Sequence, residues 1–109
     1  MPKVTYVEHN GDRRVVEVPV GENVMHGALY NGVEGISGEC GGGMSCATCH
    51  CYIDEAWTAR VGGPASQLER EMLESAYAKV KPSSRLSCQI EMTEALDGLV
   101  VHLPERQSA

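Results

Sequence analysis

Residues 38–51, GECGGGMSCATCHC, hold four of the chain's five cysteines and four of its twelve glycines. Three of these thiols, Cys40, Cys46 and Cys49, follow the spacing C-x5-C-x2-C, and Cys88 comes after 38 further residues. The glycines at 41–43 allow the backbone to turn its N–H groups toward one point without obstruction by side chains. The stretch therefore predicts a loop that wraps several thiols around a metal centre.

Length and composition place this metal loop in one small globular domain, residues 1–109. Nine basic and fifteen acidic residues give a net charge of −6, which argues against nucleic acid or an anionic membrane as a partner and leaves basic proteins open. The sequence shows no long apolar run and no signal peptide, so we expect a cytoplasmic protein. In a reducing compartment, an odd number of clustered cysteines indicates metal ligands rather than disulfides.

Hydrophobic patterning predicts a mixed α+β domain with a hairpin-rich sheet and segregated helices. The Asn10-Gly11 pair favours a tight hairpin between the first two strands, and an Asp97-Gly98 turn lies between the last two. The expected strands cover about residues 3–8, 13–20, 51–53, 85–92 and 98–103.

Two helices are predicted, over about residues 22–31 and 66–78. Gly32 suits the C-terminal cap of the first, and Ser66 with Glu69 matches a capping box at the start of the second. The expected buried stripe of the second helix consists of Leu68, Met72 and Ala76. The acidic residues expected on its solvated face are Glu69, Glu71 and Glu74.

Three kinds of thiol chemistry compete for the cysteines. A thioredoxin-type dithiol at Cys46 and Cys49 fits poorly, because that motif opens a helix in a βαβ unit. Structural zinc can take four thiolates, but it usually takes them from two short C-x2-4-C knuckles. A 2Fe–2S cluster fits better, since the plant-type spacing C-x4-C-x2-C…C differs from this one by a single residue. A Rieske centre is excluded because it needs two Cys/His pairs.

The motifs GECGGGMSCATCH and SRLSCQ together resemble the adrenodoxin/putidaredoxin type of 2Fe–2S ferredoxin, and the likeness extends through EHNG, EMLESAYA and DGLVVHLPERQ. The resemblance implies the β-grasp ferredoxin fold and an electron-transfer protein rather than an enzyme. The cluster ligands that it implies are Cys40, Cys46, Cys49 and Cys88.

The same resemblance implies partners. We expect a monomer that forms transient complexes, first with a flavin-dependent ferredoxin reductase and then with an oxygenase of the cytochrome P-450, haem-thiolate type. In such proteins the second helix docks basic partners, and Glu71 and Glu74 match its acidic positions. Glu39, directly before Cys40, matches an acidic residue near the cluster.

Several alternatives stay open at this point. Cys51 is expected to be a small buried hydrophobe, although the string T-C-H-C also resembles ferredoxins of iron–sulfur cluster assembly. His50 is expected to form structural hydrogen bonds rather than to carry protons. Electron supply to a Rieske-type dioxygenase and a non-redox zinc module are the remaining alternative functions.

Overall fold

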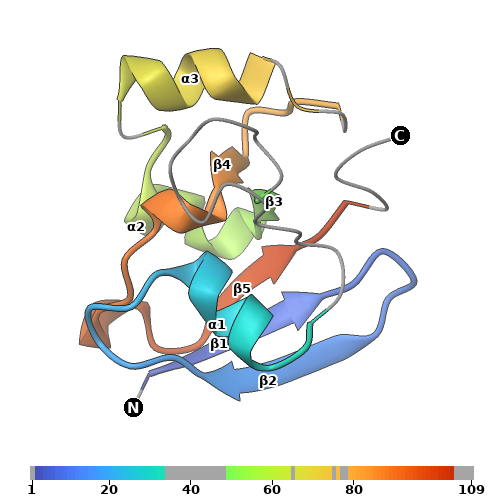
Figure 1. Ribbon diagram of the computed structural model, residues 1–109, viewed down its shortest axis with the longest axis vertical. Coiled ribbons are helices and arrows are strands. Elements are labelled where there is room, and N and C mark those ends of the chain that lie inside the picture. Colours follow the sequence, from blue (N-terminus) through green and yellow to red (C-terminus); the bar gives the residue numbers. More distant parts are fainter. Residues whose placement is uncertain (1, 34–48, 65, 75, 77–78, 105–109) are drawn as a thin grey trace.

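The structure is a computed structural model that describes residues 2–33, 49–64, 66–74, 76 and 79–104. Within this part of the chain, one five-stranded sheet runs in the order β2-β1-β5-β3-β4 (Figure 1). Its strands are β1 (Lys3–Val7), β2 (Arg13–Glu17), β3 (His50–Ile53), β4 (Ser84–Leu86) and β5 (Leu99–His102). The sheet is mixed: β5 runs parallel to β1, and the other neighbouring pairs are antiparallel.

The predicted hairpin joins β1 and β2. Gly11 adopts a φ of 94°, which favours glycine, and its N–H donates to the carbonyl of Glu8 at 2.8 Å. The resulting register pairs Thr5 with Val15 and leaves Val4 and Tyr6 on the buried face. The Asn10-Gly11 signal and the alternation of β1 are therefore confirmed.

The predicted strand 85–92 is wrong beyond Leu86. After β4 the chain makes a 3₁₀ turn, η2 (Ser87–Gln89), because both the N–H and the Oγ of Ser87 donate to the carbonyl of Cys49, at 2.9 and 2.8 Å. Farther on, the N–H of Met92 donates to the carbonyl of Glu22 at 2.8 Å. The segment therefore wraps around the end of β3, and β5 pairs with β1 and β3 rather than with β4.

Three helices are described, α1 (Val24–Tyr30), α2 (Thr58–Val61) and α3 (Gln67–Glu74), with further 3₁₀ turns η1 (Glu55–Trp57) and η3 (Glu94–Leu96). The first lies within the predicted range: the Asn23 side chain caps it by accepting from the N–H of His26 at 2.8 Å, and Gly32 follows it with a φ of 66°. The four-residue α2 is too short to leave a periodic pattern. None of the described helices has the length and apolar character needed to cross a membrane.

Helix α1 lies against the sheet over β1 and β2 (Figure 1). The hydroxyl of Tyr6 in β1 donates to the carbonyl of Val24 at 2.6 Å, in a buried position. Gly27 permits this approach, because a Cβ at that position would lie 2.5 Å from Cγ2 of Val18 and 2.7 Å from the Tyr6 oxygen. A glycine inside a helix therefore sets the distance between α1 and the sheet.

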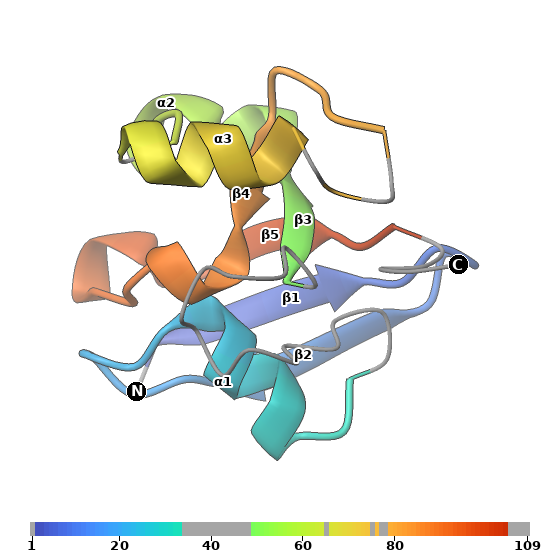
Figure 2. The same cartoon turned by 45° about the horizontal axis from the view of Figure 1, so that its top comes forward.

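Helix α3 lies at the opposite end of the molecule, beside β4 (Figure 2). Its buried positions are Glu69 and Leu73, whereas Leu68, predicted to be buried, is half exposed. Glu69 is fully buried rather than solvated, and a guanidinium compensates its charge: Arg85 Nε and Nη2 donate to the two carboxylate oxygens at 2.6 and 3.2 Å. The N–H of Leu86 donates to the same carboxylate at 3.1 Å, so Glu69 fastens α3 directly to β4.

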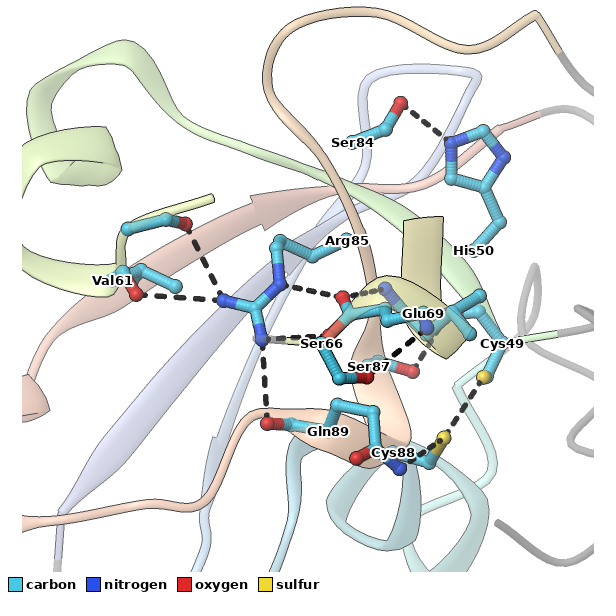
Figure 3. Close-up of polar contacts among 12 residues, drawn as sticks. Cys49, His50, Val61, Ser66, Glu69, Ser84, Arg85, Ser87, Cys88 and Gln89 are labelled. Carbon is cyan, nitrogen blue, oxygen red and sulfur yellow. Dashed lines mark hydrogen bonds and ion pairs between the residues drawn. The ribbon is translucent and has the colours of Figure 1, made fainter. Parts of the chain in front are cut away.

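The Arg85 guanidinium also donates hydrogen bonds to three backbone carbonyls (Figure 3). Nη1 donates to the carbonyls of Val61 and Gly62 at the end of α2, at 3.4 and 3.3 Å, and Nη2 donates to the carbonyl of Gln89 at 3.4 Å. One buried side chain therefore connects α2, α3, β4 and the η2 turn.

We expect Gly27→Ala to destabilise the protein by about 1–3 kcal/mol, because overpacking against Val18 and Tyr6 outweighs the roughly 1 kcal/mol by which alanine is favoured in a helix. The apparent Tm of the cluster-loaded protein should fall by about 4–8 °C for each kcal/mol. The control is Gly63→Ala, where a Cβ meets nothing within 4 Å; it should change stability by less than about 0.5 kcal/mol. Equal Tm values for the two variants would contradict the close approach of α1.

Replacing Glu69 with Gln should cost about 3–5 kcal/mol, the range for leaving one member of a buried ion pair uncompensated. The matched control on the same helix is Glu71→Gln, whose side chain is exposed and whose loss should cost less than about 0.5 kcal/mol. Denaturation of both variants by guanidinium, followed by far-UV circular dichroism, measures the difference. A Glu69→Gln protein as stable as Glu71→Gln would show that the ion pair does not hold α3 in place.

Candidate metal centre

Two of the four predicted ligands meet at the end of β3. Cys49 directly precedes this strand, and Cys88 lies in the η2 turn that follows β4. The antiparallel pairing of His50 with Leu86, extended by the two hydrogen bonds from Ser87 to Cys49, brings the thiols side by side. Their Sγ atoms lie 3.4 Å apart (Figure 3). Cys40 and Cys46 lie outside the described residues, as does Glu39.

The separation of the two sulfurs fits a shared metal ion. Two thiolates on one tetrahedral ion, each about 2.3 Å from it, lie about 3.8 Å apart, whereas a disulfide needs about 2.05 Å. Both thiols are buried, with 1% of Cys49 and 8% of Cys88 exposed, so the sulfurs are shielded from bulk water. The donor set and its spacing therefore suit two ligands of one iron in a 2Fe–2S cluster.

The ionisation of these thiols also favours a metal. The hydrogen bond to Cys88 and burial both raise the pKa of the Cys49 thiol far above its usual range. Without a cation at the site, Cys49 is therefore a neutral thiol at physiological pH. A metal ion stabilises the thiolate instead, so binding of the metal releases protons and contributes to folding.

Cys51 has a different environment from Cys49. It is fully buried in β3 among the hydrophobic core residues, and burial raises its pKa to about 12. It therefore stays protonated and lies away from solvent. The structure places Cys51 where the sequence predicted it, as a small buried side chain.

His50 is a buried structural residue next to Cys49. Its Nε2 lies 2.8 Å from the Oγ of Ser84, and its ring packs edge-on against Tyr52 with centroids 4.8 Å apart. Burial, together with the positive charge of Lys81, lowers the pKa of His50 to about 4, so the imidazole is neutral at physiological pH. Because the folded-state pKa lies below the usual 6.5, this histidine favours folding above that pH and loses the contribution as the pH falls toward 4.

The predicted docking acids are only partly described. Glu71 and Glu74 are exposed on α3, as expected for a surface that meets partners. Because Glu69 of the same helix binds the N–H of Leu86, these two acids belong to an element fixed two residues before Cys88.

Two residues of the site were missed at the level of sequence. Ser87 closes the contact with Cys49, and the side chain of Gln89 donates from Nε2 to the Sγ of Cys88 at 3.4 Å. In the sequence, only the positions of Ser87 and Gln89 on either side of Cys88 indicate that they belong to the site. Polar residues that flank a predicted metal ligand can reach its sulfur or the backbone around it.

Comparison with known proteins agrees with this geometry. Residues 7–93 match the model of the 2Fe–2S iron-sulfur cluster binding domain. Putidaredoxin of Pseudomonas putida is 51% identical over 107 residues, which cover 98% of this chain and 99% of the relative. The crystal structure of a reduced putidaredoxin variant from the same species superposes with a TM-score of 0.92 at 52% identity, over 96% of this chain and 98% of that one.

A second solved structure shows such a carrier with a partner. Putidaredoxin in its covalent complex with putidaredoxin reductase superposes with a TM-score of 0.90 at 53% identity, over 95% of this chain and 99% of that one. The cofactor, the β-grasp fold and the electron-transfer class expected from the sequence are thereby confirmed. The alternative of a non-redox zinc module is wrong. The chain belongs to the 2Fe–2S ferredoxins and is a putidaredoxin-like electron carrier.

Proposed function

We propose that this ferredoxin carries single electrons from a flavin-dependent ferredoxin reductase to an oxygenase of the haem-thiolate, cytochrome P-450 type. The observation that carries the proposal is the contact of Cys49 with Cys88 in a chain that matches putidaredoxin over nearly its whole length. The covalent complex of putidaredoxin with its reductase supports the donor. When bound, the cluster takes up and releases one electron. We keep the cytoplasm as the proposed compartment and a monomeric single domain as the proposed form.

We further propose that the ligand set is Cys40, Cys46, Cys49 and Cys88. The chain's own part in the chemistry is to hold two thiols in contact, to exclude water from them, and to keep neutral groups such as His50 around them. Burial without hydrogen-bond donors would make reduction unfavourable, so donors near the sulfurs have a direct effect on function.

The alternative of a ferredoxin for iron–sulfur cluster assembly rested on Cys51. This thiol is fully buried and protonated, so it is not presented to a partner that delivers or receives iron. The described residues therefore give no reason to prefer assembly over electron supply to an oxygenase. Electron supply to a Rieske-type dioxygenase remains the alternative within the same electron-transfer function.

Transfer to two successive partners requires contacts that form fast and dissociate fast. Such interfaces are small, below about 1,200 Å², and they use complementary charge to speed encounter more than to increase affinity. The net charge of −6 and the exposed Glu71 and Glu74 suit a basic partner surface. Glu39 belongs to the same proposal on sequence grounds.

The ligand assignment is tested by replacing single thiols. We expect Cys88→Ser to lose the cluster or severely weaken it, and Cys51→Ser to keep the visible absorption and the uptake of one electron. Loss of Cys88 should also lower stability, because the metal contributes free energy of folding. Iron content, visible spectra and reductive titration measure the result. A Cys51→Ser protein without iron beside a Cys88→Ser protein with a normal cluster would overturn the assignment.

The docking surface is tested by reversing charge on α3. With putidaredoxin reductase as the probe, Glu71→Lys combined with Glu74→Lys should slow reduction by about tenfold at low ionic strength, while the cluster spectrum and potential stay nearly unchanged. Raising the salt to roughly 0.15 M, where the Debye length is about 8 Å, should slow the wild type more than the variant. Stopped-flow absorption records both rates.

The matched control makes the same change of charge elsewhere. Glu17→Lys combined with Glu94→Lys reverses two exposed acids, one of them on β2, the edge strand farthest from the β4 edge that holds α3. Equal slowing by both double variants would mean that only net charge matters. Unchanged rates for the α3 variant would remove this helix from the docking surface.

A further inference from the structure

The side chain of Gln89 folds back onto the sulfur of the preceding residue. Its Nε2 donates to Cys88 Sγ at 3.4 Å, within the range for a hydrogen bond to sulfur (Figure 3). Hydrogen bonds to the thiolates are among the factors that set the reduction potential of an iron–sulfur cluster. This bond is made by a side chain, so it can be removed without changing the backbone.

The backbone that carries this amide is fixed from the buried side. The carbonyl of Gln89 accepts from Nη2 of Arg85 at 3.4 Å, and the bidentate pair with Glu69 holds the Arg85 guanidinium in place. The N–H of Ile90 donates to the carbonyl of Ser87 at 3.3 Å and closes the η2 turn around Cys88 and Gln89. The backbone that carries the donor is therefore held in position from the buried side.

The charge balance gives the direction of the effect. Reduction would add one negative charge to the cluster that Cys88 would help to hold, and an N–H whose positive end points at that sulfur would stabilise the reduced form more than the oxidised form. The guanidinium of Arg85 is already balanced by Glu69, so its net field at the cluster is reduced. The neutral amide of Gln89 acts instead at direct contact with the Cys88 sulfur, at 3.4 Å.

We propose that Gln89 tunes the cluster, and that its side-chain hydrogen bond to Cys88 raises the reduction potential of this ferredoxin. The proposal rests on Cys88 being a ligand, which belongs to the proposed function. It assigns Gln89 a role in the driving force for electron transfer, separate from the docking role of α3.

The test removes the donor and keeps the volume. We expect Gln89→Leu and Gln89→Met, in the cluster-loaded protein, to reduce the equilibrium constant for reduction at least threefold, about 30 mV at 59 mV per tenfold for one electron. The Fe–S(Cys) stretching bands in resonance Raman spectra should move to higher frequency and lose part of their sensitivity to D₂O. Spectroelectrochemistry gives the potential.

Gln67→Leu is the control, since it makes the same substitution at an exposed position on α3 and should leave potential and Raman bands unchanged. An unchanged or raised potential in the Gln89 variants would overturn the proposal, and so would failure of both to hold a cluster, because Gln89 would then serve assembly. A normal spectrum in Cys88→Ser would remove the ligand assignment and this proposal together. A lost spectrum there, with wild-type potentials in the Gln89 variants, would remove this proposal alone.

Discussion

The carbonyl of Cys49 is the point on which the site depends. It accepts two hydrogen bonds from Ser87, and these extend the pairing of β3 with β4 until the thiols of Cys49 and Cys88 touch. The two cysteines are separated by 38 intervening residues, so this contact closes a long loop at an entropic cost that grows slowly with length. Sheet hydrogen bonds offset part of that cost, and binding of metal offsets more of it. Fold and metal site are therefore coupled: each lowers the cost of forming the other.

A buried ion pair then fixes what surrounds the sulfurs. Replacing such a pair with apolar groups is often neutral for stability, so its value lies elsewhere, in the positions that it imposes. The carboxylate of Glu69 lies between Arg85 and the N–H of Leu86, and these bonds fix how α3 lies on β4. The same guanidinium reaches the carbonyl of Gln89. One polar contact therefore positions both α3 and the backbone of Gln89 beside Cys88.

Short sequence patterns predicted the structure correctly where the conformation depends on neighbouring residues. The Asn10-Gly11 turn, the alternation of β1 and the glycine after α1 all follow from backbone preferences of a few residues. The family motifs supplied the fold and the cofactor, and the structure brings Cys49 and Cys88, two of the four predicted ligands, into contact. Cys51 was placed correctly in the core.

The sequence-based predictions failed where contacts between distant residues determine the structure. The apolar pattern of 85–92 resembles a strand, but hydrogen bonds to Cys49 and Glu22 bend it away after Leu86. Glu69 matched a capping box and a solvated face, and its N–H does donate to the Oγ of Ser66 at 3.1 Å. Its burial depends on an arginine 16 residues away, which no helical periodicity can reveal. The contact of Gln89 with the sulfur of Cys88 was missed for the same reason, since it depends on how η2 folds.

The two proposed ligands that the structure describes differ in their exposed fractions. Cys88 is 8% exposed and Cys49 is 1% exposed, so Cys88 lies nearer the surface, with the half-buried Gln89 next to it. A partner that docked on the acids of α3, as proposed, would meet an element fixed to β4 just before this turn. In the proposed function, Gln89 affects the thermodynamics of transfer and Glu71 and Glu74 affect the rate of encounter, and the two sets are connected through the pair of Glu69 and Arg85. The potential depends on hydrogen bonds to the sulfur, whereas the rate of encounter depends on surface charge. The surface charge can therefore change without altering the potential, and the potential can change without loss of docking.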